Sequence, residues 1–148
     1  MAYDWHWATS APGPIAPLGW VKDVITYAVS QIPRSKIVLG IGLYGYDWSG
    51  DQGTAVSWGE AFTRSHTHGA AVRWDPASQS PWFVYDDERG SHHTVWFENA
   101  YSVSAKVQLM RDEGLGGAYF WLYGTEDDLT WPLVAAKLGL HQSAQKTG

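Results

Sequence analysis

The stretch from residue 114 to residue 128 constrains the fold more than any other part of the chain. It reads Gly-Leu-Gly-Gly-Ala-Tyr-Phe-Trp-Leu-Tyr-Gly-Thr-Glu-Asp-Asp. Gly114 suits the left-handed position that closes a helix, and the acidic residues 126–128 suit the first turn of another. Between them, residues 118–123 form an apolar run that is too short for a helix, as in a strand buried on both faces. Helix, strand and helix make one unit of a parallel α/β protein, whose sites gather at the carboxyl ends of strands, where Trp121 stands.

A similar unit precedes this one. Residues 36–43, Lys-Ile-Val-Leu-Gly-Ile-Gly-Leu, are apolar and rich in branched side chains, and they predict a second strand buried on both faces. A helix is predicted from Gly19 until Pro33 ends it, and its inward face carries Val21, Val24, Ile25, Ala28 and Ile32. Residues 1–7 predict the end of a further strand, and the prolines of residues 11–17 predict a loop.

The hydrophobic pattern changes to a period of two between residues 70 and 97. Residues 72–75 predict a short strand, and residues 82–85 and 94–97 predict an antiparallel hairpin around a turn at Gly90. This part of the chain is therefore predicted as a small α+β insertion between the βα units.

Five further segments complete the predicted order. Residues 50–53 predict a loop, and Ser57 with Glu60 three residues later predicts a capped helix at 57–65. Helices are also predicted at residues 101–113, with Val103, Val107 and Met110 inward, and at residues 129–138. A polar tail follows residue 140.

Composition excludes several classes of function. The net charge of −5 argues against a nucleic-acid partner, because phosphate binding needs a basic surface. Cysteine is absent, so disulfides, thiolate catalysis and cysteine-ligated metals are excluded. No apolar run approaches the roughly 20 residues of a membrane span, and no signal-peptide pattern opens these residues. Ten Trp and eight Tyr beside four Phe are typical either of a surface that stacks on sugar rings or of a Trp-rich core.

Three motifs are better explained by structure than by chemistry. Gly40-Ile-Gly-Leu-Tyr-Gly45 matches the dinucleotide fingerprint, but the residues after it predict no helix whose N-terminus could hold a pyrophosphate. These glycines are instead expected to let a neighbouring strand or a ligand approach closely. The pairs His66/His68 and His92/His93 lie in polar, turn-like stretches, so they predict solvated loops rather than a metal site. The carboxylates at 86–88 likewise fall at the predicted hairpin turn.

Tyr3, Asp4 and Trp121 stand at the predicted carboxyl ends of strands. Two interpretations remain open from the residues alone. These side chains either line a site, or form a buried Tyr–Asp hydrogen bond and a core Trp.

Four motifs in this order resemble glycoside hydrolase family 18. Met1-Ala2-Tyr3-Asp4 is similar to the family's Met-x-Tyr-Asp on barrel strand six, and residues 36–48 are similar to strand seven and its exit. Residues 70–97 resemble the small α+β insertion of the family, and residues 114–121 resemble strand eight with its terminal Trp. The sequences of residues 44–48 and 96–100 resemble those of the bacterial spore-cortex and cell-wall branch of the family.

This resemblance implies an α/β fold that is the C-terminal part of a (β/α)8 TIM barrel, strands six to eight, with a small α+β insertion after strand seven. It assigns residues 1–48 to strand six, helix six and strand seven, and residues 49–98 to the insertion. Residues 99–140 are assigned to helix seven, strand eight and helix eight, and residues 141–148 to a tail. Strands one to five are expected to precede Met1. The family's general acid, the Glu of an Asp-x-x-Asp-x-Asp-x-Glu signature, is expected there too, since this sequence has no such spacing.

The activity that the resemblance implies is hydrolysis of β-1,4-linked glycans that contain N-acetylglucosamine, either peptidoglycan and spore cortex or chitin. The substrate's own acetamido group would act as nucleophile, with retention of configuration. Tyr3 would donate a hydrogen bond to that group, Asp4 would orient it, and Trp121 would stack beneath the sugar. The cleft would be shaped by five further residues: Tyr44, Tyr46, Trp82, Phe83 and Glu98.

The resemblance also implies what accompanies this activity. No metal and no cofactor are expected, and the partners are a glycan substrate and either the missing half of the barrel or a second copy of the chain. A location outside the cell, in the wall or on the spore is implied. The alternative is a catalytically silent, lectin-like relative of the same fold.

Overall fold

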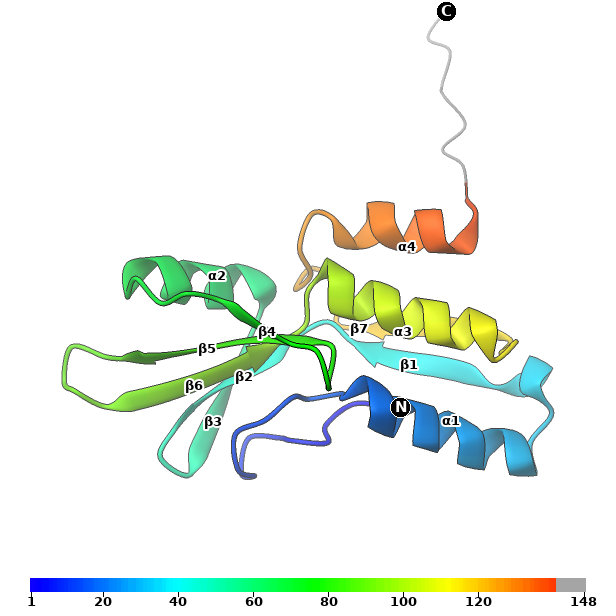
Figure 1. Ribbon diagram of the computed structural model, residues 1–148, viewed down its shortest axis with the longest axis horizontal. Coiled ribbons are helices and arrows are strands. Elements are labelled where there is room, and N and C mark those ends of the chain that lie inside the picture. The colour runs from blue at the N-terminus through cyan, green and yellow to red at the C-terminus, as the bar shows by residue number, and fades with distance from the viewer. Residues whose placement is uncertain (141–148) are drawn as a thin grey trace, which may run out of the picture.

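The structure is a computed structural model that describes residues 1–140, and it holds two sheets with helices beside each (Figure 1). The predicted tail at residues 141–148 lies outside the described residues. In chain order the elements are α1 (Leu18–Gln31), the short 3-10 helix η1 (Arg34–Lys36), β1 (Val38–Gly42), β2 (Gly45–Ser49), β3 (Gln52–Val56), α2 (Trp58–Thr67), β4 (Arg73–Asp75), β5 (Ser80–Asp86), β6 (His92–Phe97), α3 (Ala100–Asp112), β7 (Gly117–Trp121) and α4 (Thr130–Leu138). None of the helices within residues 1–140 has the length and apolar character to cross a membrane.

The first sheet contains the two strands that the sequence predicted most clearly. β1 and β7 pair in parallel, with Val38 opposite Gly117 and Gly42 opposite Trp121. α3 packs on this pair, and α1 and α4 lie on either side of α3 (Figure 1). The prediction of a parallel α/β unit built from these two strands is therefore confirmed.

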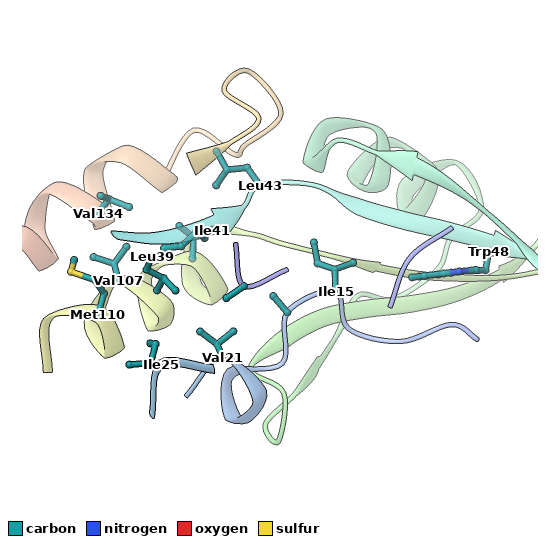
Figure 2. Packing of buried hydrophobic residues seen from close by; sticks show 13 residues of the cluster. Ile15, Val21, Ile25, Leu39, Ile41, Leu43, Trp48, Val107, Met110 and Val134 are labelled. Atoms are coloured by element: carbon teal, nitrogen blue, oxygen red, sulfur yellow. The ribbon is translucent and has the colours of Figure 1, made fainter. Parts of the chain in front are cut away.

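A single apolar core joins this sheet to its helices. Leu39 and Ile41 of β1 are buried against Val107 and Met110 of α3, and Val21 of α1 closes the cluster (Figure 2). Each such side chain contributes roughly 1.5–3 kcal/mol to folding when it is fully buried. The inward faces predicted for α3 and for most of α1 are thus confirmed, but Ile32 is 46% exposed because α1 ends at Gln31 and the next residue is extended.

Two expectations for the strands are wrong. Residues 1–7 form no strand, because only one backbone hydrogen bond, from Ala2 to Gly40, joins them to β1 before Asp4 turns the chain with a φ of 62°. β7 is not buried on both faces: Tyr119 is 41% exposed and Trp121 is 53% exposed. The exposed side chains Tyr119 and Trp121 alternate with the half-buried Ala118 and Phe120, so they share one face of β7.

The second sheet has the strand order β3-β2-β6-β5-β4 and is antiparallel throughout. β2 begins at Gly45, directly after Leu43 and Tyr44, so the aromatic exit of the first sheet is already a strand of the second. The predicted loop at 50–53 is only a tight turn at Gly50, whose φ is 61°, and β3 follows at once. The second sheet therefore starts at Gly45, ahead of residue 49, where the resemblance places the start of an insertion. The predicted hairpin is confirmed, with Trp82 opposite Trp96.

Helix ends follow the local chemistry of the sequence. Ser57 and Glu60 form the predicted capping box at the start of α2. Gly114 has a φ of 63° after α3, as predicted for a helix-ending glycine. The acidic residues after β7 do not enter the first turn of α4. Asp127 instead accepts hydrogen bonds from the backbone N–H groups of Ala100 and Leu129, and so joins the starts of α3 and α4.

The glycines of the Gly40–Gly45 motif serve close packing. A side chain at Gly40 would meet the Tyr119 hydroxyl at 2.5 Å, and one at Gly45 would meet the backbone oxygen of Trp96 at 2.3 Å. No helix follows the motif, because Gly45 opens β2. The prediction that these glycines allow neighbouring groups to approach is confirmed.

Candidate functional site

A pocket of about 380 Å³ lies where the carboxyl ends of β1 and β7 meet the second sheet. Four separate segments contribute to it: residues 3–4, 44–46, 55–60 and 121–125. Its lining residues are Tyr3, Asp4, Tyr44, Tyr46, Ala55, Val56, Ser57, Glu60, Trp121, Leu122 and Thr125. Five of the residues predicted for the site, Tyr3, Asp4, Tyr44, Tyr46 and Trp121, are thus brought together by the fold.

Asp4 and Tyr44 form the polar centre of the pocket. The Tyr44 hydroxyl donates a hydrogen bond to Asp4 Oδ1. Burial of Tyr44, followed by this bond, raises the pKa of the phenol far above its ordinary value, so Tyr44 stays a donor at any physiological pH. Asp4 adopts a left-handed backbone conformation, with φ 62°, which residues other than glycine seldom adopt. Such conformations concentrate at functional sites.

Aromatic rings continue from this centre along β2. Tyr3 and Tyr44 meet edge to face with ring centroids 6.1 Å apart, and Tyr44 and Tyr46 do the same at 5.7 Å. Burial, and then the neighbouring Tyr119, raise the pKa of Tyr3, so its hydroxyl also remains protonated at neutral pH. This part of the pocket therefore offers several phenolic groups beside the carboxyl group of Asp4.

Trp121 closes β7 and borders the pocket. Its backbone oxygen accepts a hydrogen bond from the Leu43 amide at 2.6 Å, which extends the pairing of β1 and β7 by one residue. The peptide bond between Trp121 and Leu122 is cis. Trp121 is 53% exposed, so part of this residue is accessible to a ligand. A half-exposed indole beside phenolic donors is suited to stacking on a sugar ring.

The start of α2 forms a wall that the sequence did not predict as part of a site. Glu60 Oε2 accepts hydrogen bonds from the Ser57 backbone at 2.7 Å and from the Ser57 hydroxyl at 2.9 Å. These bonds lower the pKa of Glu60 below its ordinary value. The Trp58 amide donates to the Thr125 oxygen at 2.9 Å, which attaches α2 to the segment after β7. The capping motif was visible in the sequence, but nothing local indicated that it would face the pocket.

Glu98 was expected to shape the cleft, and the structure corrects this. Its side chain is fully buried, and both carboxylate oxygens accept hydrogen bonds from Lys106 Nζ, at 3.0 and 2.8 Å. It lies between the end of β6 and the first turns of α3, so the carboxylate is held by the buried ammonium instead of facing a ligand.

Trp82 and Phe83 also lie away from the pocket. Phe83 is buried in the core between α2 and the second sheet, because its place in β5 points that way. Trp82, its neighbour on the opposite face of β5, stacks on Trp96 with ring centroids 5.4 Å apart and an interplanar angle of 13°. Both aromatic side chains pack the insertion.

The histidines lie in regular structure, which corrects the expectation of solvated turns. His92 and His93 belong to β6, and His66 lies in α2 with His68 at its end. Among residues 1–140, no cluster of three or more His, Asp or Glu side chains could hold a metal ion. The carboxylates at 86–88 do stand at the hairpin turn, where Asp87 accepts hydrogen bonds from the backbone of Arg89 and Ser91.

Other hollows of comparable size occur within residues 1–140, among them one of about 390 Å³ along the start of α2, which Ser57, Glu60 and Arg64 line without any aromatic side chain. A second of about 580 Å³ runs along α3 and includes Trp74 and Lys137, but none of its lining residues comes from β1 or β7. A third of about 330 Å³ surrounds Asp47 on the opposite side of β2 from Tyr46. None of these combines half-exposed aromatic rings with polar groups at the carboxyl ends of the parallel strands, so the pocket at Asp4 is the candidate site.

Comparisons with known proteins identify relatives of this chain. The model of the family described as glycosyl hydrolases family 18 matches residues 1–126. The cortical fragment-lytic enzyme of Bacillus anthracis is 39% identical over 140 residues, which is 90% of this chain and 33% of that enzyme. The spore cortex-lytic enzyme SleL of Bacillus cereus has a similar structure, with a TM-score of 0.88 and 38% identity over 93% of this chain and 33% of that one. A chitinase from Chromobacterium violaceum gives a TM-score of 0.89 and 39% identity over 95% of this chain and 45% of that one. The chain thus spans about a third to a half of the length of these relatives.

Proposed function

Since this chain belongs to glycosyl hydrolase family 18, we propose that its pocket binds, as part of a glycosidase, glycans that contain N-acetylglucosamine. One observation carries the proposal: Asp4, Tyr44 and Trp121 meet in a single pocket at the carboxyl ends of two parallel strands. The polar pair and the half-exposed indole are what a neutral sugar ring needs, namely hydrogen-bonding groups on one side and a flat apolar surface on another.

The proposal includes the larger architecture. β1 and β7 would be strands seven and eight of a (β/α)8 barrel, with the second sheet and α2 as the α+β insertion after strand seven. Support comes from the parallel pairing of β1 with β7 and from the hydrogen bond that Ala2 donates to Gly40 on the other side of β1. In this arrangement residues 1–4, which form no strand here, would follow strand six on that side of β1, and the face of β7 that carries Tyr119 and Trp121 would be turned to the barrel interior.

Within the pocket each residue has a distinct proposed role. Trp121 would support the sugar whose anomeric carbon reacts. Tyr3 would donate a hydrogen bond to its acetamido group, and Asp4, fixed by Tyr44, would orient that group for attack. The acetamido oxygen would then form a bond to the anomeric carbon as the glycosidic oxygen is protonated and leaves, and water would later open the intermediate with overall retention.

The proton for the leaving oxygen must come from a group outside this pocket. Asp4 and Glu60 are the only carboxyl groups in its lining. Asp4 is bonded to Tyr44, and Glu60 is held ionised by Ser57. We therefore expect the general acid to come from another part of the barrel, as the resemblance implies.

Two substrates fit this proposal equally, and one competing function exists. The named relatives include spore cortex-lytic enzymes and a chitinase, so peptidoglycan of the cortex and chitin are the two candidate polymers. A lectin-like protein with the same pocket would bind these glycans without cleaving them.

Binding and turnover measured on the purified chain test the proposal. We expect a soluble N-acetylglucosamine oligomer to quench the tryptophan fluorescence and to remain uncleaved, because the general acid is absent from the pocket. Lack of binding would contradict the proposal that this pocket binds the glycan. Turnover by the chain alone would contradict the proposal that the general acid comes from outside the pocket. In an enzyme that contains these residues and the general acid, the first product should keep the β configuration. A lectin-like relative would release no product.

A further inference from the structure

One wall of the pocket comes from α2 and presents a carboxylate in a fixed position. Ser57 and Glu60 line the pocket beside Ala55 and Val56 of β3. The two hydrogen bonds from Ser57 hold Glu60 Oε2, so the side chain does not swing freely into solvent as most surface glutamates do. The neighbouring hydrogen bond from Trp58 to Thr125 fixes the whole start of α2 against the pocket.

The charge of this wall is negative. Hydrogen bonds from the Ser57 backbone and hydroxyl lower the pKa of Glu60, so its carboxylate is ionised at neutral pH. Asp4 supplies a second carboxyl group in the same lining. The lining contains neither Lys nor Arg, and the net charge of the chain, −5, has the same sign.

Arg64 stands one turn along α2 from Glu60, and the two side chains line a neighbouring hollow. Its guanidinium is bonded to the buried carboxylate of Asp47, whose side chain is 2% exposed. The attraction between the Arg64 charge and the Glu60 carboxylate is the smallest of the effects on the pKa of Glu60. The positive charge of Arg64 is thus already matched within the insertion, and the charge of Glu60 remains available to act on a ligand.

We propose that Glu60 is a specificity-determining residue, through which the pocket selects uncharged sugar units over units that carry a free carboxylate. This inference rests on the proposed glycan-binding function and adds the charge of the substrate to it. N-acetylmuramic acid with a free lactyl group differs from N-acetylglucosamine by one such carboxylate. Like charges about 6 Å apart at a partly exposed site repel strongly enough for roughly a tenfold difference in affinity.

The experiment compares two ligands that differ in the charge of their lactyl groups, with one methyl group added to each lactyl group in the ester. A peptide-free tetrasaccharide of alternating N-acetylglucosamine and N-acetylmuramic acid is titrated into the chain by calorimetry, beside its lactyl methyl ester. The variants are Glu60→Gln, which keeps the capping box because Gln is accepted at that helix position, and Glu88→Gln. Glu88 is exposed in the turn between β5 and β6 and is absent from the pocket lining, so this variant changes the net charge equally.

The measured quantity is the ratio of the Kd for the free acid to the Kd for the ester. We expect about 10 for the wild-type chain and for Glu88→Gln, about 2 for Glu60→Gln, and a smaller wild-type ratio in 0.5 M salt, because salt screens exposed charges. A wild-type ratio near 1, or equal ratios in the two variants, would overturn the role of Glu60. If the wild-type chain bound neither ligand nor a neutral N-acetylglucosamine tetramer, the proposed function would fail, and this inference with it.

Discussion

Asp47 and His93, which lie 46 positions apart in the chain, are joined by a hydrogen bond of 2.7 Å between His93 Nδ1 and Asp47 Oδ1. The same carboxylate accepts a hydrogen bond from the Tyr85 hydroxyl at 2.7 Å and pairs with the guanidinium of Arg64. Asp47 therefore fastens β2 to α2, β5 and β6 at one buried point. Tyr46, the preceding residue, points to the opposite side of β2 and lines the pocket. This cluster thus stabilises the part of the insertion that borders the site.

Replacement of Asp47 by Ala should lower the free energy of unfolding by about 3 kcal/mol, because it leaves three buried or half-buried polar groups without their shared acceptor. Urea unfolding measures the change. Asp86→Ala is the matched control, since Asp86 and His92 form a pair of similar length, 2.8 Å, that is 69% and 65% exposed. Exposed pairs contribute about 0–1 kcal/mol. Equal losses in the two variants would contradict the structural role of Asp47.

Lys106→Met should destabilise the chain by roughly 3–5 kcal/mol, because it leaves the buried carboxylate of Glu98 without its cation. The two side chains are each 1% exposed. The double variant Glu98→Gln, Lys106→Met should recover much of that loss, since it removes both charges from the interior. Thermal unfolding measures the stabilities of the single and the double variant beside that of the wild-type chain. If the double variant were less stable than Lys106→Met alone, the ion pair would stabilise the fold by more than the cost of burying its two charges.

Trp121→Ala should cost less than about 1.5 kcal/mol of stability and should abolish the fluorescence response to N-acetylglucosamine oligomers, because the indole is half exposed and borders the pocket. Trp48→Ala is the matched control: Trp48 is 1% exposed, so its loss should cost about 3–5 kcal/mol. Tyr3→Phe should leave stability nearly unchanged and weaken binding. If Trp121→Ala were as destabilising as Trp48→Ala while its folded fraction bound normally, Trp121 would be a core residue.

The stability contributed by Glu60 should depend on pH in one direction. Its pKa in the folded chain is lowered from the ordinary value of 4.5 by the hydrogen bonds from Ser57. The contribution is therefore fully present above about pH 4.5 and is lost as the pH falls through the lower folded pKa. Unfolding measured from pH 6 to pH 3 should show a shallower decline for Glu60→Gln than for the wild-type chain. If the free energies of unfolding of the two chains fell in parallel with pH, the hydrogen bonds from Ser57 would stabilise the ionised and the protonated Glu60 equally.

The chain should associate with itself or with a polypeptide that covers its first sheet. Val38, Tyr119 and Trp121 are 51%, 41% and 53% exposed, and within residues 1–140 β7 pairs only with β1. Apolar strands with a free edge and an uncovered face favour pairing with other chains. Light scattering across a range of concentrations measures this association. A monomer that persists at high concentration and melts cooperatively would contradict it.

Local chemistry in the sequence was sufficient to predict most of the elements. The capping box of Ser57 and Glu60, the left-handed glycine at 114 and the hairpin of β5 and β6 follow from interactions among residues close in the chain. The segments of β1 and β7 were also recognisable locally, although their parallel pairing joins residues far apart in the sequence. The local pattern also placed Trp121 at the end of its strand, whereas Tyr3 and Asp4 reach the pocket without belonging to a strand. The family resemblance then added Tyr44 and Tyr46 to the expected site.

The tertiary structure decided what these residues face. Glu98 and Glu60 are both glutamates near the start of a helix, yet one is buried against Lys106 and the other lines the pocket. That difference depends on how the second sheet docks on the first, through contacts between residues far apart in sequence. The exposure of Trp121 likewise depends on what covers the sheet, which an apolar strand pattern does not specify. Sequence periodicity determines which residues share a face, but burial is a property of the whole assembly of elements.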